Sequence, residues 1–216
     1  MTTRVLLVHG AATTPRVWDP LLPLLAVPGA GEVMAPLRPS SGDLATELAF
    51  LADLARGSLV VGVSGGATLG LALLASEVRL AGAVLHEPAV GSLVPGLLDH
   101  VVAGWESGGV AGFASALYGP GWTPDLAPAD PEAVARDLGM FRRFQPARPL
   151  EGNGPVVTTV GALSPPPRQE AARVLTEQYG ITSRTLPGTG HFVQRDNPAA
   201  LAAVVREVLR AGTLGT

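Results

Sequence analysis

Cysteine and lysine are both absent from this chain of 216 residues. Without cysteine there is no disulfide, no thiolate nucleophile, no thiolate zinc site and no iron–sulfur cluster. Without lysine there is neither a Schiff-base amine nor the lysine of a phosphate-binding P-loop. These absences exclude whole classes of cofactor and nucleotide chemistry, and we expect no cofactor.

Charge is also scarce, because charged residues make up 15% of the chain, whose net charge is −3. No basic run or stripe is visible, so we expect no nucleic-acid partner but a small, largely uncharged molecule. No apolar run reaches the roughly 18 residues that a membrane span requires. Because the first residues resemble a core strand more than a signal peptide, we expect a cytoplasmic protein without a membrane partner.

What is present is an alternation of short β-type runs with longer helical patterns, which is typical of parallel βαβ construction. Strands are expected at residues 4–10, 31–39, 58–63, 81–88, 154–162 and 180–188. Helices are expected at residues 19–26, 40–57, 64–76, 167–179 and 197–212. Asp19, Ser41 or Asp43, and Pro198 mark three helix starts. The chain length and the 47% hydrophobic content fit a single α/β domain over residues 1–216.

The alternation stops at about residues 88–150, where glycine, proline and two helical patterns take over. Most of the aromatic residues lie in this segment: Trp105, Phe113, Tyr118, Trp122, Phe141 and Phe144. We interpret it as an inserted helical cap. Its rings either line an apolar pocket or hold the cap together, and the sequence does not separate these two roles.

The most informative motif is Gly62-Val63-Ser64-Gly65-Gly66, which lies between an apolar β-type run and an apolar helical run. A G-x-S-x-G motif in this setting is typical of a nucleophile elbow, a sharp turn that exposes a serine hydroxyl. The glycines permit the strained turn and close backbone contacts. Ser64 is therefore the candidate nucleophile.

With this elbow, the segments VLLVHGAA and PGTGHFVQRDNPAAL make the chain resemble the α/β-hydrolase superfamily over residues 4–87 and 154–212. The resemblance implies that two of the usual eight strands are missing, which leaves a mostly parallel six-stranded sheet flanked by helices. It also implies that the backbone N–H groups of Ala11 and Gly65 form an oxyanion hole.

His191, in the glycine-rich PGTGHF loop, is the candidate general base that takes the proton of Ser64. Its alternative role is to cap the final helix. His9 and His86 end strands and are expected to be structural, His100 lies in the cap, and no pair of histidines has a zinc spacing.

The acid of the triad departs from the common pattern, because Ser164 stands in the loop where most members of the superfamily have aspartate. Some members take the acid from the preceding strand end, which here is Glu87, and Pro88 favours an extended Glu87. Glu170 and a Ser-His dyad remain alternatives. Asp196 is expected to cap the last helix with Asn197.

The resulting hypothesis is a serine hydrolase acting on a small apolar ester, lactone or related acyl compound through Ser64, His191 and Glu87. The same fold also supports cofactor-free perhydrolases, C–C bond hydrolases and lyases. A ligand-binding relative without turnover is the alternative from a different class, because the usual aspartate is missing.

Overall fold

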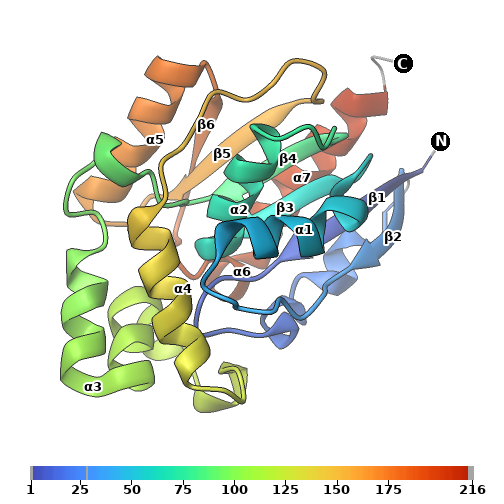
Figure 1. The fold of residues 1–216 in the computed structure, drawn as a ribbon. Coiled ribbons are helices and arrows are strands. Elements are labelled where there is room, and N and C mark those ends of the chain that lie inside the picture. Colours follow the sequence, from blue (N-terminus) through green and yellow to red (C-terminus); the bar gives the residue numbers. More distant parts are fainter. Residues whose placement is uncertain (1, 28, 214–216) are drawn as a thin grey trace.

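The computed structural model describes residues 2–27 and 29–213, and one sheet of six strands forms its centre (Figure 1). The strands lie in the order β2-β1-β3-β4-β5-β6, and every neighbouring pair is parallel. Their bounds are β1 Thr3–Val8, β2 Ala30–Met34, β3 Leu59–Val63, β4 Gly82–His86, β5 Val156–Gly161 and β6 Thr182–Leu186. The predicted fold class, an α/β sheet of six strands flanked by helices, is confirmed.

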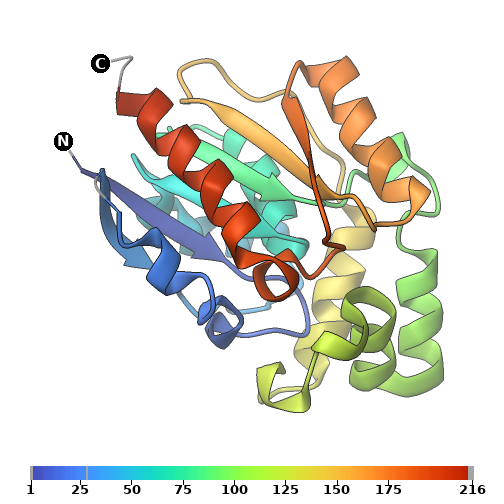
Figure 2. The same cartoon turned by 180° about the vertical axis from the view of Figure 1, so that it is seen from behind.

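Helices cover both faces of this sheet. α1 (Leu44–Ala55) and α2 (Gly65–Leu74) lie in front of it in Figure 1, and α7 (Pro198–Thr213) crosses the opposite face in Figure 2. α5 (Pro166–Tyr179) packs against β5 and β6. The central strands β3 and β4 consist entirely of buried residues because both of their faces are covered.

Two further helices, α3 (Asp99–Tyr118) and α4 (Glu132–Arg143), lie beyond the carboxyl ends of the strands, in the segment where the cap is expected (Figure 1). α3 is bent at Gly108 and Gly109, which have non-helical dihedral angles. The two halves of α3 pack closely, since a Cβ atom on Gly112 would lie 2.0 Å from the carbonyl oxygen of Gly104. Only glycine fits there, so this glycine-rich stretch forms a tight helical hairpin.

Three local predictions are wrong. The helix over residues 19–26 with Asp19 as N-cap is two 3₁₀ turns, Pro15–Trp18 and Leu22–Leu25, and Asp19 ends the first of them. The strand expected over 31–39 ends at Met34. The chain then leaves the sheet and places the side chain of Arg38 in a buried polar network. Asn197, without Asp196, caps α7, since its Oδ1 accepts a hydrogen bond from the N–H of Ala200 at 3.1 Å.

Parallel strands all end at one edge of the sheet, and ligand sites of such sheets lie outside that edge. Ser64 follows β3, Glu87 follows β4, and His191 lies in the loop between β6 and the short helix α6 (Val193–Asp196). The topology thus brings together three residues that are far apart in the sequence.

Candidate active site

Ser64 occupies a strained turn between β3 and α2. Its dihedral angles, φ 58° and ψ −122°, lie in a region that side-chain-bearing residues rarely adopt. The turn needs small neighbours, because a Cβ on Gly66 would lie 1.8 Å from the carbonyl oxygen of Val8 and a Cβ on Gly62 would lie 2.5 Å from that of Gly66. The geometry is that of a nucleophile elbow.

His191 and Glu87 form a direct pair. The distance from His191 Nδ1 to Glu87 Oε2 is 2.7 Å, and both side chains are buried. Glu170, the alternative acid, is exposed on α5 and pairs with Arg173. Within residues 2–27 and 29–213, Glu87 is thus the only carboxylate that is hydrogen-bonded to His191.

The backbone of Glu87 differs from the expectation. The prediction that Pro88 holds it extended is wrong, because its φ is +49°. Two hydrogen bonds fix this conformation: the N–H of Glu87 donates to the carbonyl oxygen of Thr159 at 3.0 Å, and Arg168 Nη1 donates to the carbonyl oxygen of Glu87 at 3.1 Å. Such over-determined strain is common where a functional side chain must be aimed.

The other carboxylate oxygen of Glu87, Oε1, accepts hydrogen bonds from the N–H of Gly161, at 2.9 Å, and from the hydroxyl of Ser164. Ser164 stands where the resemblance to the superfamily places the usual aspartate. Its neutral hydroxyl donates a hydrogen bond to the carboxylate of Glu87. Arg168 Nε lies 3.7 Å from Oε2. The carboxylate is thus held on both of its oxygens.

These surroundings set the protonation states of the pair. Burial by itself raises the pKa of Glu87, but His86, His191 and Arg168 outweigh burial and hold that pKa well below its usual range. Burial, and then Arg168, lower the pKa of His191 to about 4, although Glu87 opposes the change. At neutral pH we therefore expect a carboxylate next to a neutral imidazole.

The second nitrogen of His191 is available. Nε2 is buried and has no hydrogen-bond partner among the residues that the structure describes, so Ser64 and His191 are not hydrogen-bonded to each other here. Since Nδ1 donates to Glu87, the tautomer inferred from this contact leaves a lone pair on Nε2. That atom can accept a proton.

Tyr118 joins the site from the cap, and sequence reasoning counted it only among the cap aromatics. Its hydroxyl donates to the carbonyl oxygen of Ala11 at 2.6 Å, and its ring centroid lies 5.7 Å from that of His191. Burial raises the pKa of the phenol far above its usual range, and hydrogen bonding with Ser64 and Thr13 offsets part of that rise. Tyr118 is therefore a neutral group beside Ser64.

No hydrogen bond is found among the described residues for the predicted oxyanion donors, the N–H groups of Ala11 and Gly65. Gly65 begins α2, where the N–H groups have no intrahelical acceptor. The loop that carries Ala11 lies against the elbow, since a Cβ on Gly10 would be 3.0 Å from the Cβ of Ser64. A developing oxyanion next to Ser64 is the acceptor that these donors suit.

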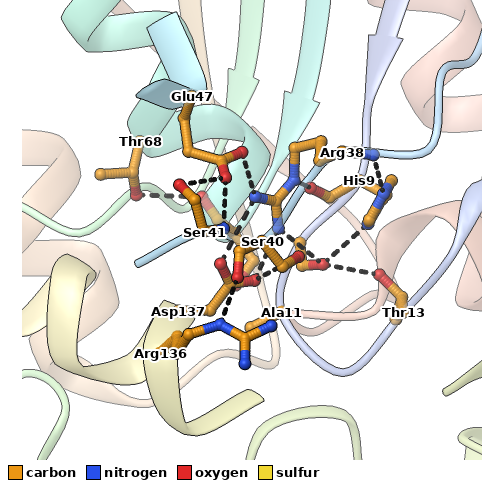
Figure 3. A network of polar contacts seen from close by, with 12 residues as sticks. His9, Ala11, Thr13, Arg38, Ser40, Ser41, Glu47, Thr68, Arg136 and Asp137 are labelled. Atoms are coloured by element: carbon orange, nitrogen blue, oxygen red, sulfur yellow. Dashed lines mark hydrogen bonds and ion pairs between the residues drawn. The ribbon is translucent and has the colours of Figure 1, made fainter. Parts of the chain in front are cut away.

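A buried ion network contacts the loop that carries Ala11 (Figure 3). Arg38 contacts Glu47 of α1 through Nη1 at 2.9 Å and Asp137 of α4 through Nη2 at 2.7 Å, and all three side chains are at most 2% exposed. Its Nε donates to the carbonyl oxygen of His9 at 3.0 Å, and Nη2 lies 3.4 Å from that of Gly10. The network ties the cap, the core and the loop of Ala11 together.

We expect Arg38→Met to lower the free energy of unfolding by about 3–5 kcal/mol, because it leaves two buried carboxylates without their cation. Chemical denaturation followed by circular dichroism measures this loss. The matched control is Arg173→Met, which removes an exposed arginine paired with two glutamates and should leave the midpoint of denaturation nearly unchanged, because solvent screens such pairs. Equal effects of the two substitutions would contradict the assignment.

The other histidines have other partners. His9 Nδ1 lies 3.0 Å from the carbonyl oxygen of Gly10, and burial followed by Arg38 lowers the pKa of His9 to about 3. His86 contacts the hydroxyl of Thr159 at 2.9 Å and the carbonyl oxygen of Gly190 at 3.1 Å, so it braces the loop of His191. His100 lies exposed on α3. In the described part of the chain no cluster of side chains suits a metal ion.

A cavity of about 20 Å³ lies next to Ser64, between the elbow and the cap. It has room for about one water molecule. A neighbouring groove of about 320 Å³ shares three wall residues with this cavity, Ala89, Leu98 and Phe141. These three residues therefore border both the groove and the cavity.

The chain also matches a known protein family over most of its length. Residues 5–204 match the model of a family described as the alpha/beta hydrolase family. The chain belongs to that family. Among curated proteins no match was found, and none of the helices described here is long and apolar enough to cross a membrane.

Several solved structures share the fold at low sequence identity. NosK from Streptomyces actuosus is 18% identical with a TM-score of 0.75, and the match covers 99% of this chain and 100% of the NosK chain. A hydrolase from Pseudomonas aeruginosa PA01 is 18% identical with a TM-score of 0.72, covering 96% and 90%. The enol-lactonase from Burkholderia xenovorans LB400 is 18% identical with a TM-score of 0.67, covering 97% and 92%.

Proposed function

We propose that this α/β hydrolase is a serine hydrolase that transfers the acyl group of a small ester, lactone or related acyl compound to water. The observation that carries the proposal is the 2.7 Å contact between His191 and Glu87, at the strand edge where the Ser64 elbow lies. A nucleophile, a base and a group that orients the base are the three parts of such a site.

In the proposed reaction, the hydroxyl oxygen of Ser64 bonds to the carbonyl carbon while Nε2 of His191 takes the hydroxyl proton. The carbonyl oxygen becomes an oxyanion and accepts hydrogen bonds from the N–H groups of Ala11 and Gly65. The tetrahedral intermediate then breaks its bond to the leaving alcohol, which receives the proton from His191. An acyl-enzyme on Ser64 results.

Water then attacks the acyl-enzyme, with His191 as base a second time, and releases the acid and free Ser64. Glu87 stabilises the imidazolium that forms in each half of the reaction. Catalytic hydrogen bonds often tighten only when substrate is bound, and on that basis we expect the bond between Ser64 and His191 to form in the complex.

The proposal is tested by rapid mixing with p-nitrophenyl acetate. We expect a burst of p-nitrophenol stoichiometric with protein, followed by slower turnover. The acylation rate should be constant across neutral pH and fall as the pH drops through about 4, the pKa of His191, because an imidazolium accepts no proton. A protein that binds the ester without releasing p-nitrophenol would be a ligand-binding relative, and the proposal would be rejected.

A further inference from the structure

One charged residue lines the cavity next to Ser64, and it is Arg168. The remaining wall is mostly apolar, with Phe113, Leu117 and Leu138 of the cap among its residues. The other polar side chain besides the nucleophile is that of Thr68, whose hydroxyl is engaged in two hydrogen bonds with the backbone. Polar recognition by a side chain in this cavity is therefore left to Arg168.

Among the described residues, the guanidinium of Arg168 makes its polar contacts with a single residue, Glu87. Arg168 is 3% exposed, and Nη1 donates to the carbonyl oxygen of Glu87 at 3.1 Å. A guanidinium has five N–H donors in a rigid fork. Within the described part of the chain, no hydrogen bond is found for Nη2, and this nitrogen is not among the fully enclosed polar atoms that lack a partner, so its donors are open to a ligand.

The contact of Arg168 with the carboxylate of Glu87 is an ion pair without a hydrogen bond. Arg168 Nε lies 3.7 Å from Oε2, beyond hydrogen-bond distance, and that oxygen already accepts a hydrogen bond from His191. A buried cation is costly unless it is paired and hydrogen-bonded. Arg168 also disfavours protonation of His191, the step that the proposed reaction requires. A second anion in the cavity would accept hydrogen bonds from Arg168. It would also offset the effect of Arg168 on the protonation of His191.

We propose that Arg168 binds a carboxylate of the substrate, so that the acyl compound is an ester or lactone with a free carboxylate group. This inference rests on the proposed function and narrows its substrate class, against the expectation of a largely uncharged molecule. Arginine recognises a carboxylate by two parallel hydrogen bonds, which orients the acyl group as well as binding it. Because the cavity holds about 20 Å³, it must widen for such a substrate to bind.

Two pairs of ethyl esters test the proposal, each matched in acyl length: monoethyl adipate with ethyl hexanoate, and monoethyl succinate with ethyl butyrate. Chromatography of the released acids gives kcat/KM. We expect the wild-type protein to prefer the carboxylate-bearing ester at least 10-fold in one or both pairs, as expected when one charge-assisted contact is gained. Arg168→Met should reduce that preference at least 10-fold.

The matched control is Arg173→Met, on the same helix but exposed to solvent, which should leave the preference unchanged. If Arg168 serves only to support Glu87, Arg168→Met will slow both esters of a pair equally, and the proposal is overturned. A wild-type preference for the neutral esters overturns it without any variant. If p-nitrophenyl acetate is hydrolysed but no carboxylate ester is favoured, this inference fails while the proposed function stands; binding of the ester without release of p-nitrophenol rejects the proposed function itself.

Discussion

Ser64→Ala is expected to lower kcat for p-nitrophenyl acetate by about a million-fold, the order of loss seen when the nucleophile of a catalytic triad is removed. The residual rate comes from the oxyanion donors and from substrate binding, which need no hydroxyl. Only a small polar atom is lost, so the fold should be retained, as circular dichroism would show.

Labelling with a fluorophosphonate probe gives an independent readout. The wild-type protein should be labelled, and Ser64→Ala should not. Ser115→Ala, which removes an exposed serine of α3, is the control and should be labelled like the wild type. Undiminished labelling of the Ser64 variant would place the nucleophile elsewhere.

Glu87→Gln should reduce kcat by up to about 10⁴-fold while the fold is retained, as when a triad acid is made neutral. The loss should appear in kcat far more than in KM, because the interaction of the carboxylate with imidazolium strengthens in the transition state. Steady-state kinetics on p-nitrophenyl acetate measures both constants.

Glu170→Gln is the control for this substitution, since Glu170 is exposed and bound to Arg173. It should behave like the wild type. Adding Ser164→Asp to Glu87→Gln should restore part of the activity, because Ser164 already contacts the Glu87 carboxylate. If Glu170→Gln is the damaging substitution, the acid has been misassigned; if neither matters, the site works as a dyad.

Much of the fold was predictable from the sequence because its signals are local. Apolar runs broken by glycine and proline marked the strands, and the GVSGG and PGTGHF segments marked Ser64 and His191. Glu87 was reached by chain order and resemblance, while its positive φ went unseen because that angle depends on contacts with Thr159 and Arg168.

Other residues of the site could not be predicted. Arg38 and Asp137 are 99 positions apart and meet only because the cap folds back onto the core. Arg168 and Tyr118 reach the site from α5 and α3, and nothing in their own segments distinguishes them from an arginine or a ring on any helix. Such residues are found only after the strands are ordered in space.

The contact between Ser164 and Glu87 bears on where the acid of the proposed triad can originate. The ends of β4 and β5 point at the same place beside His191, so either strand end is a suitable origin for the acid. A chain with carboxylates at both positions would set two like charges against one imidazole, and one of them would have to take up a proton. Relocation of the acid therefore favours a small neutral donor at the position it leaves, and serine is such a residue.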